Sequence, residues 1–138
     1  MKISTRGRYG LRLLVDLAEN DCNRPIALSQ VACRQDLSEK YLQQVALLLT
    51  RAGFLISTKG SGGGYLLKND PSEIVVYDVL SLLEGGLDFS EPPADADTAI
   101  RRCLHTHFYQ PLDEHLAQIF KGMTLSDIVR SVPFSYSI

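Results

Sequence analysis

A run of glycines between two apolar segments is the part of this sequence best suited to contact a polyanion. Residues 59–65 read Lys-Gly-Ser-Gly-Gly-Gly-Tyr. In a phosphate-binding glycine loop a helix follows the glycines, but here both flanking segments, 54–58 and 65–68, have the composition of strands. The pattern therefore predicts a β-hairpin whose tip carries one cation, Lys59, and little side-chain bulk. Such a tip is able to lie close against a nucleic-acid backbone.

A second group of polar side chains follows Ser38, a residue type that caps the starts of helices. Helical spacing places Ser38, Tyr41, Gln43 and Gln44 in the first turns of that helix, away from an apolar stripe, and all four are candidate DNA contacts. A glutamine side chain offers both a donor and an acceptor to a base edge, so these positions are candidates for reading DNA sequence. Ordinary polar residues on a solvent-exposed helix face are the alternative.

Other basic and hydroxyl side chains suit contacts to phosphates, which set the register of a protein on DNA without reading its sequence. The predicted phosphate contacts are Lys2, Ser4, Thr5, Arg6, Arg8 and Arg51, and those of the hairpin tip are Lys59, Ser61, Gly62 and Gly63. Residues 1–69 hold ten lysines and arginines against five acids (+5), and residues 70–138 hold four against eleven (−7), within a net charge of −2. A basic half joined to an acidic half indicates a polyanion-binding part and a separate body.

The elements that must position these residues follow the order helix, short helix, turn, helix, hairpin. The predicted elements are helices over about 4–19, 28–34 and 38–52 and a hairpin over 55–68. Ser29 is the expected N-cap of the short helix. The expected apolar stripe of the first helix is Leu11, Leu14, Val15 and Ala18. This order is that of a winged helix-turn-helix, in which the third helix enters the major groove and the hairpin, or wing, meets the minor groove.

The second half of the chain predicts a helix near 76–84, an exposed connection at 91–95, a long helix over 97–121 and a last helix from a capping-box-like start at 124–127. Pro111 lies inside the long pattern and is expected to kink or restart it. The apolar residues of this helix are too many for so small a head to bury, so we expect a second copy of the chain to cover them in a homodimer.

The predicted fold is therefore mainly α with a small β-hairpin. The predicted parts are a winged helix-turn-helix DNA-binding domain (1–84), a flexible linker loop (85–96), and a dimerisation helix with the C-terminal tail (97–138).

Composition excludes several other classes of protein. With 138 residues, 45% of them hydrophobic, the chain has enough apolar side chains for a packed core. It has no apolar run of membrane-spanning length and no signal sequence, and its three cysteines are too few for a disulfide framework, so a cytoplasmic location is expected. The one crowd of reactive groups, Cys103, His105 and His107 with nearby carboxylates, lacks an oxyanion hole or cofactor loop, and no enzyme activity is predicted.

Four motifs at consistent separations resemble the Rrf-type family of bacterial transcriptional regulators. They are the opening at 1–11, Leu-Ser-Glu-Lys-Tyr-Leu-Gln-Gln at 37–44, the glycine-rich hairpin tip at 59–66 and Thr-Leu-Ser-Asp-Ile at 124–128. The resemblance implies a dimeric repressor that binds an imperfect inverted repeat in promoters. Many relatives carry glutamate where this chain has Gln43 and arginine where it has Lys59, so the operator sequence and the minor-groove contact are expected to differ.

The resemblance also indicates which signals the protein is able to sense. The iron–sulfur branch of the family holds its cluster with three cysteines before the long helix, and only Cys103 stands in that region here. A two-iron cluster needs about four ligands, mostly thiolates, so no cofactor is predicted. A cluster that uses Cys103, with His107 one helical turn away, is kept as the less favoured alternative.

The chain is closest in character to the cluster-free, CymR-like branch, which represses genes of sulfur and cysteine metabolism. Members of that branch are understood to respond through a complex with cysteine synthase, an enzyme that captures a C-terminal isoleucine. This chain ends in Ile138, with Tyr136 two places earlier, and both are candidate partner-binding residues. Direct thiol sensing through Cys33 or Cys22, and a scaffold that has lost its DNA contacts, are the remaining alternatives.

Overall fold

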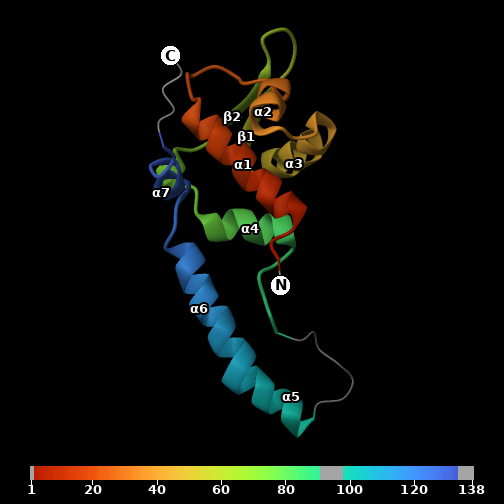
Figure 1. Ribbon diagram of the computed structural model, residues 1–138, viewed down its shortest axis with the longest axis vertical. Helices are drawn as coiled ribbons and strands as arrows, with labels where there is room; N and C mark the ends of the chain where they lie inside the picture. The colour runs from red at the N-terminus through yellow and green to blue at the C-terminus, as the bar shows by residue number, and fades with distance from the viewer. Residues whose placement is uncertain (1, 91–97, 134–138) are drawn as a thin grey trace.

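The computed structural model describes residues 2–90 and 98–133, and the statements below concern those residues. Its elements are α1 (Thr5–Glu19), α2 (Leu28–Gln35), α3 (Glu39–Arg51), β1 (Leu55–Thr58), β2 (Gly64–Leu67), the 3-10 turn η1 (Pro71–Glu73), α4 (Val76–Glu84), α5 (Ala99–Leu104), the π-helical turn η2 (His105–Tyr109), α6 (Gln110–Lys121) and α7 (Leu125–Val129). Figure 1 shows a head formed by α1–α4, the hairpin and α7, from which the long helix α5–η2–α6 extends. The predicted fold class is confirmed.

Local capping residues set the starts of α1 and α3. The Ser4 hydroxyl accepts a hydrogen bond from the Gly7 amide (3.1 Å), and the Ser38 hydroxyl accepts one from the Tyr41 amide (3.3 Å), as expected for N-caps. The prediction for α2 was wrong, because Ala27 rather than Ser29 is its N-cap, with an extended backbone and no capping side chain.

A tertiary contact explains the start of α2. Ile26 exchanges two backbone hydrogen bonds with Tyr65 of β2 (3.0 and 2.8 Å), which holds the chain extended up to the helix. Gly64 makes this pairing possible, because its φ is +153° and a Cβ atom there would lie 2.3 Å from the Ile26 carbonyl oxygen. Within the hairpin Leu55 pairs with Leu67 and Thr58 with Gly64.

Helix α1 is the centre of the head and packs against α2, α3, α4 and α7. Its most buried side chains are Leu13, Leu14 and Leu17, whereas Leu11 and Val15 are only partly buried. The predicted apolar stripe therefore included one of the most buried residues, Leu14, but it missed Leu13 and Leu17, which are also at the centre of the buried face. A helix surrounded on several sides buries a wider arc than the single stripe of a surface helix.

Helix α7 returns to the head, although its sequence follows the long helix. Leu125 lies in the same core as α1 and α3 and is 1% exposed. The Leu125 amide donates to the Ile74 carbonyl (2.8 Å), and the Val76 amide donates to the Met123 carbonyl (2.9 Å). The predicted division at residues 84 and 97 stays untested, but the structure adds α7 to the packing of the head.

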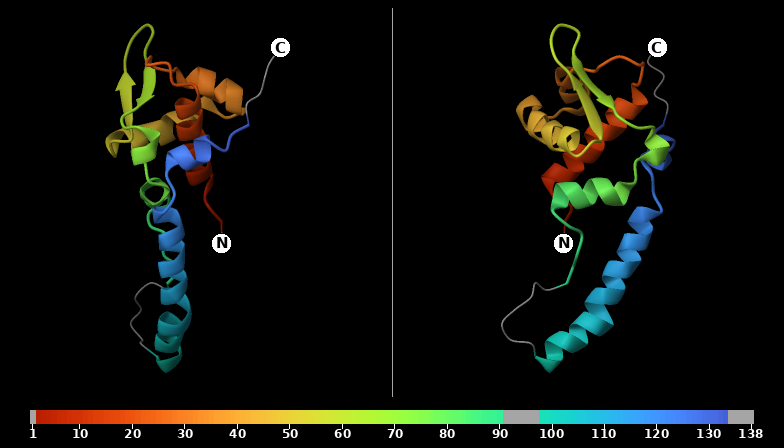
Figure 2. Two further views of the ribbon diagram at one scale, coloured as in Figure 1. Left: turned by 90° about the vertical axis from the view of Figure 1, so that its left-hand side faces the viewer. Right: turned by 180° about the vertical axis from the view of Figure 1, so that it is seen from behind.

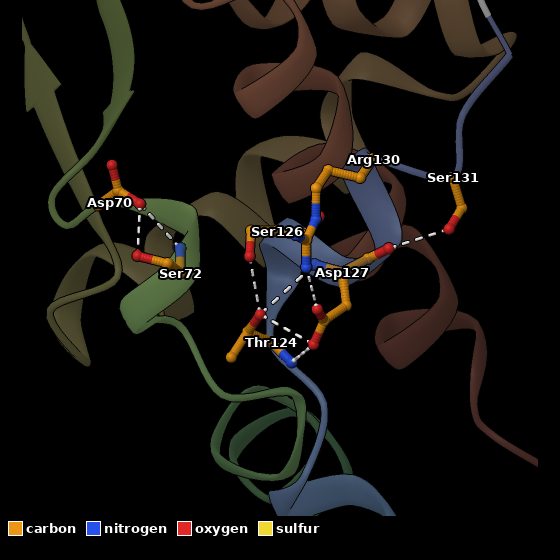
Figure 3. Close-up of polar contacts among 7 residues, drawn as sticks. All are labelled: Asp70, Ser72, Thr124, Ser126, Asp127, Arg130 and Ser131. Carbon is orange, nitrogen blue, oxygen red and sulfur yellow. Dashed lines mark hydrogen bonds and ion pairs between the residues drawn. The ribbon is translucent and has the colours of Figure 1, made fainter.

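A capping box begins α7, as the sequence indicated (Figure 3). The Thr124 amide donates to the Asp127 carboxylate (2.9 Å), and the Asp127 amide donates back to the Thr124 hydroxyl (3.4 Å). Hydrogen bonds to the Asp127 carboxylate lower its pKa, first the one from the Thr124 amide, then those from the Thr124 hydroxyl (3.1 Å) and from Arg130. A second Asp, Asp70, accepts from Ser72 in the turn at the start of η1.

The long helix passes through Pro111 by widening one turn instead of breaking. Pro111 is the second residue of α6, and the π-helical turn η2 stands immediately before it, closed by a bond from the Gln110 amide to the His105 carbonyl. Proline lacks an N–H and its ring crowds the preceding turn, and a π turn is one known way to accommodate such a break in the bond pattern. We expected Pro111 to kink or restart the helix; the chain instead passes the proline with a π turn, and both views in Figure 2 show the helix continuing from α5 to α6.

The described part of the predicted linker is tied to this helix. The Phe89 amide and the Ser90 hydroxyl each donate to the Asp113 carboxylate of α6, both at 2.7 Å. The rest of the predicted linker, from residue 91, lies outside the described residues.

Candidate nucleic-acid interface

Helix α3 has one face in the core and one free for a ligand. Leu42 and Val45 are 0% and 1% exposed, while Gln43 and Gln44 between them are exposed. Tyr41 is half-buried, and its ring packs edge-on against Tyr9 of α1 with 5.2 Å between centroids. The two glutamines therefore stand free in the first turns of α3, and Tyr41 joins α3 to α1.

The start of α1 lies beside this face. Arg6 lines a surface depression of about 210 Å³ together with Tyr41 and Gln44 of α3. Thr5 and Arg6 are both exposed. The structure thus brings together a cation predicted to hold a phosphate and two residues predicted to contact bases.

Two other predicted phosphate contacts of the N-terminal arm, which we define as residues 2–8, lie beside a different cavity. Lys2 and Arg8 line a second cavity, of about 470 Å³, together with Glu84 of α4. The Arg8 Nε atom donates to the Ile3 carbonyl (2.9 Å). The Ser4 hydroxyl is already used, since it accepts from Gly7 and donates to Glu84 (2.7 Å).

The wing tip is open, as a close approach to DNA requires. Lys59, Ser61 and Gly62 are exposed, and a Cβ atom at Gly62 would meet nothing within 4 Å. Gly63 has an internal role, because its amide closes the turn onto the Gly60 carbonyl (3.0 Å) and a Cβ atom there would lie 2.3 Å from the Thr58 carbonyl oxygen. Its role in DNA binding remains a prediction, as does that of the whole set.

Arg51 is the predicted contact most remote along α3. It is the last residue of that helix and exposed. Eight residues separate it from Gln43, which corresponds to about 12 Å along the helix axis. The structure does not gather it with the glutamines, so any phosphate that it contacts is a different one.

A buried polar cluster, which we name the Asp16 clamp, fixes α2 against α1. The Asp16 carboxylate, 1% exposed, accepts from Arg34 (2.7 and 3.1 Å) and from Gln35 (2.8 Å), and Arg12 donates to the Gln35 carbonyl. The hydrogen bond to Asp16 raises the pKa of Arg34. Sequence reasoning missed this cluster, although an acid amid the leucines of α1 was a visible signal.

Sequence reasoning also missed Glu84, which accepts from the Ser4 amide (3.0 Å) and from the Ser4 hydroxyl. The signal was its position, since a carboxylate in the last turn of a helix is opposed by the helix dipole. Lys40, exposed in the first turn of α3 near both glutamines, is a further cation that belongs with the candidate interface.

Two helices joined by a turn, the second with free polar side chains, followed by a wing that pairs back onto the head, define a winged helix-turn-helix protein. The Rrf2 family model, described as an iron-dependent transcriptional regulator, matches residues 3–131. The chain belongs to the Rrf2 family of transcriptional regulators.

Individual relatives agree with this assignment. The chain is 34% identical over 128 residues to the transcriptional regulator CymR of Bacillus subtilis, covering 93% of this chain and 89% of that one. It is 30% identical over 132 residues to IscR of Klebsiella pneumoniae, covering 95% and 81% of the two chains. The solved structure of B. subtilis CymR superposes with a TM-score of 0.81 at 32% identity and covers 96% of this chain and 99% of that one. These relatives are transcriptional regulators and not enzymes.

The family description implies iron, and the side chains of the described residues do not fit an iron site. Cys103 is exposed on α5, and Cys22 and Cys33 lie in the head. Among residues 2–90 and 98–133, no three histidine, cysteine or acidic side chains converge as metal ligands.

Tyr136 and Ile138 lie outside the described residues. No helix in the described ranges is long and apolar enough to span a membrane.

Proposed function

We propose that this protein is a homodimeric, sequence-specific transcriptional repressor that acts on promoter DNA in the cytoplasm. The observation that carries the proposal is the free face of α3, where Gln43 and Gln44 are exposed and Gln44 lines one depression with Arg6 of α1. The glutamines read base edges, and Ser38 caps the helix that presents them. The arm, Arg51 and the wing around Lys59 hold phosphates and set the register.

An exposed apolar face on the long helix supports the dimer. Ile100, Phe108 and Ile119 are 74%, 54% and 57% exposed, and Leu104 is 40% exposed. Large apolar side chains aligned on a helix that projects from the head are typical of a protein interface. A two-fold dimer presents two copies of α3, which explains how one chain would read an inverted repeat.

The regulated genes are proposed to be those of sulfur and cysteine metabolism. The support is the similarity to B. subtilis CymR, whose structure is described as that of the global cysteine regulator. We further propose that the signal arrives through cysteine synthase, which would bind the C-terminal Ile138 and Tyr136. Removing Ile138 should abolish co-purification with cysteine synthase while leaving DNA binding intact, and retained co-purification would refute this partner.

A redox signal is the second candidate. It is favoured by the exposure of Cys22, Cys33 and Cys103 and by the similarity to Staphylococcus aureus CymR, which was solved in an oxidised form. Peroxide should then weaken DNA binding reversibly in the wild type and not in Cys33→Ser. An iron–sulfur cluster at Cys103 predicts instead a coloured anaerobic preparation with stoichiometric iron.

Selection of duplexes from a random pool by the purified protein tests the central proposal. We expect an enriched inverted repeat and a protein mass in solution of twice the 15.3 kDa chain. A monomer that enriches no sequence above bulk competitor at physiological salt would contradict it.

A further inference from the structure

The N-terminal arm is held by a single carboxylate from another helix. One oxygen of Glu84, the last residue of α4, accepts from both the Ser4 amide (3.0 Å) and the Ser4 hydroxyl (2.7 Å). Ser4 is the N-cap of α1 and its hydroxyl also accepts from the Gly7 amide. Glu84 therefore fixes the cap itself, and with it the direction in which residues 2–4 leave α1.

Two glycines of α1 make room for this contact. A Cβ atom at Gly7 would lie 2.1 Å from the Glu84 carboxylate oxygen, and one at Gly10 would lie 2.3 Å from a methyl carbon of Leu83. Glycine inside a helix costs roughly 0.5–1 kcal/mol relative to alanine. Gly7 and Gly10 lie one helical turn apart, and the end of α4 fills the space beside both of them. Together they form a groove in α1 into which α4 packs.

The charge of Glu84 is better placed for α1 than for α4. A carboxylate at the end of α4 is unfavourable for that helix, whereas the start of α1 carries free amides that favour an anion. Among the acids that line the adjoining cavity, Asp88 is exposed and Glu84 is the one bonded to the arm.

We propose that Glu84 is a positioning residue for DNA binding, which holds the arm so that Lys2, Thr5, Arg6 and Arg8 meet the phosphates in one register. The inference rests on the proposed function of the arm. Because Glu84 carries a negative charge, removing it has two opposite effects. Loss of charge strengthens binding to any duplex. Loss of the acceptor frees the arm, so its phosphate contacts no longer hold the base-reading glutamines in one register, and binding to the preferred duplex weakens more than binding to a scrambled one.

Three variants separate these effects on the selected duplex and on a scrambled duplex of the same composition. Glu84→Gln keeps an acceptor oxygen without the charge, Glu84→Ala removes both, and Asp88→Asn is the control that changes charge alone beside the same cavity. We expect Glu84→Gln to behave like Asp88→Asn. Glu84→Ala should lose roughly ten-fold in the ratio of affinities for the two duplexes, the order associated with a hydrogen bond to a charged group.

Gly7→Ala provides a second route to the same state without touching Glu84. Its methyl group would lie 2.1 Å from the Glu84 carboxylate oxygen and 2.8 Å from a methyl carbon of Ile3, so the carboxylate must move, and the variant should reproduce the loss of discrimination of Glu84→Ala. Amide hydrogen exchange adds a readout without DNA, in which the amides of Ser4 and Gly7 should exchange faster in Glu84→Ala and be protected in Glu84→Gln.

The possible results separate the two levels of the proposal. If the wild type does not discriminate between the duplexes, the proposed function fails and this inference falls with it. If the wild type discriminates and Glu84→Ala discriminates equally well, with unchanged exchange at Ser4, the inference alone is overturned.

Discussion

Lys59 is the cation whose contribution is simplest to isolate, because it stands exposed at the wing tip. Lys59→Ala should lower the slope of log affinity against log salt concentration by about 1, the amount expected for one lost phosphate contact. Fluorescence anisotropy titrations at several salt concentrations measure this slope. Lys68→Ala, which removes the same charge at the base of the hairpin, is the matched control, and an equal effect of the two variants would argue against a specific wing contact.

Gln43 tests sequence reading rather than affinity. Since its side chain is exposed between two buried neighbours, Gln43→Ala should fold normally and lose discrimination at one base pair per half-site, at about 1–3 kcal/mol. Competition with single-base variants of the selected duplex measures it. Lys40→Ala on the same helix should instead weaken all duplexes alike, and a similar pattern for Gln43→Ala would assign Gln43 to the phosphates.

At the scale of elements, the Asp16 clamp determines how α2 meets α1. Arg34→Ala leaves a buried carboxylate with Gln35 as its remaining side-chain partner, so we expect a loss of about 2 kcal/mol in the free energy of unfolding. This is below the 3–5 kcal/mol of a fully buried pair because the Arg34 side chain is 38% exposed. Denaturant titration measures the loss. Arg24→Ala in the loop before α2 is the control. If Arg34→Ala lowers the free energy of unfolding as little as Arg24→Ala does, the Asp16 clamp does not stabilise the fold.

The cap of α7 predicts a dependence of stability on pH. The Thr124 amide lowers the pKa of Asp127 from its ordinary 3.8. The ionised carboxylate therefore stabilises the folded state fully at pH values above the ordinary pKa, which is that of the unfolded chain. This contribution is lost as the pH falls through the lowered value of the folded state. The difference in unfolding free energy between wild type and Asp127→Asn should therefore be present at neutral pH and shrink in acid. A difference independent of pH would show that Asp127 acts without its charge.

Elements with local signals were predictable from the sequence. Ser38 marked the start of α3, strand composition around glycines marked the hairpin, and Thr124 with Asp127 marked α7. The start of α2 was not, because one residue, Ile26, pairs with a strand that comes almost forty positions later and leaves no periodic trace.

The candidate site divides in the same way. Exposed polar residues on a patterned helix, such as Gln43, follow from local spacing. The contact of Glu84 with Ser4 depends on how α4 lies on α1, which no local pattern encodes, although Gly7 in the first turn of α1 was a trace of it.

At the scale of the whole molecule, the exposed face of the long helix should decide the assembly. Phe108→Glu places a charge in this face. We expect it to raise the dissociation constant of the dimer by about ten-fold or more, because a charge buried without a partner is strongly disfavoured. Sedimentation equilibrium measures it. Gln118→Glu, an equal charge change on α6, is the control, and a dimer unaffected by Phe108→Glu would place the interface elsewhere.

The π turn before Pro111 has a mechanical consequence. Because the helix continues past the proline without a break, residues Ala99–Lys121 form one continuous lever of 23 residues, about 35 Å long. Pivoting such a lever by about 10° where α6 meets α4 would swing its tip by about 6 Å. A small rotation at the head therefore produces a large displacement at the far end of the helix. Conversely, a displacement imposed at the far end produces only a small rotation at the head.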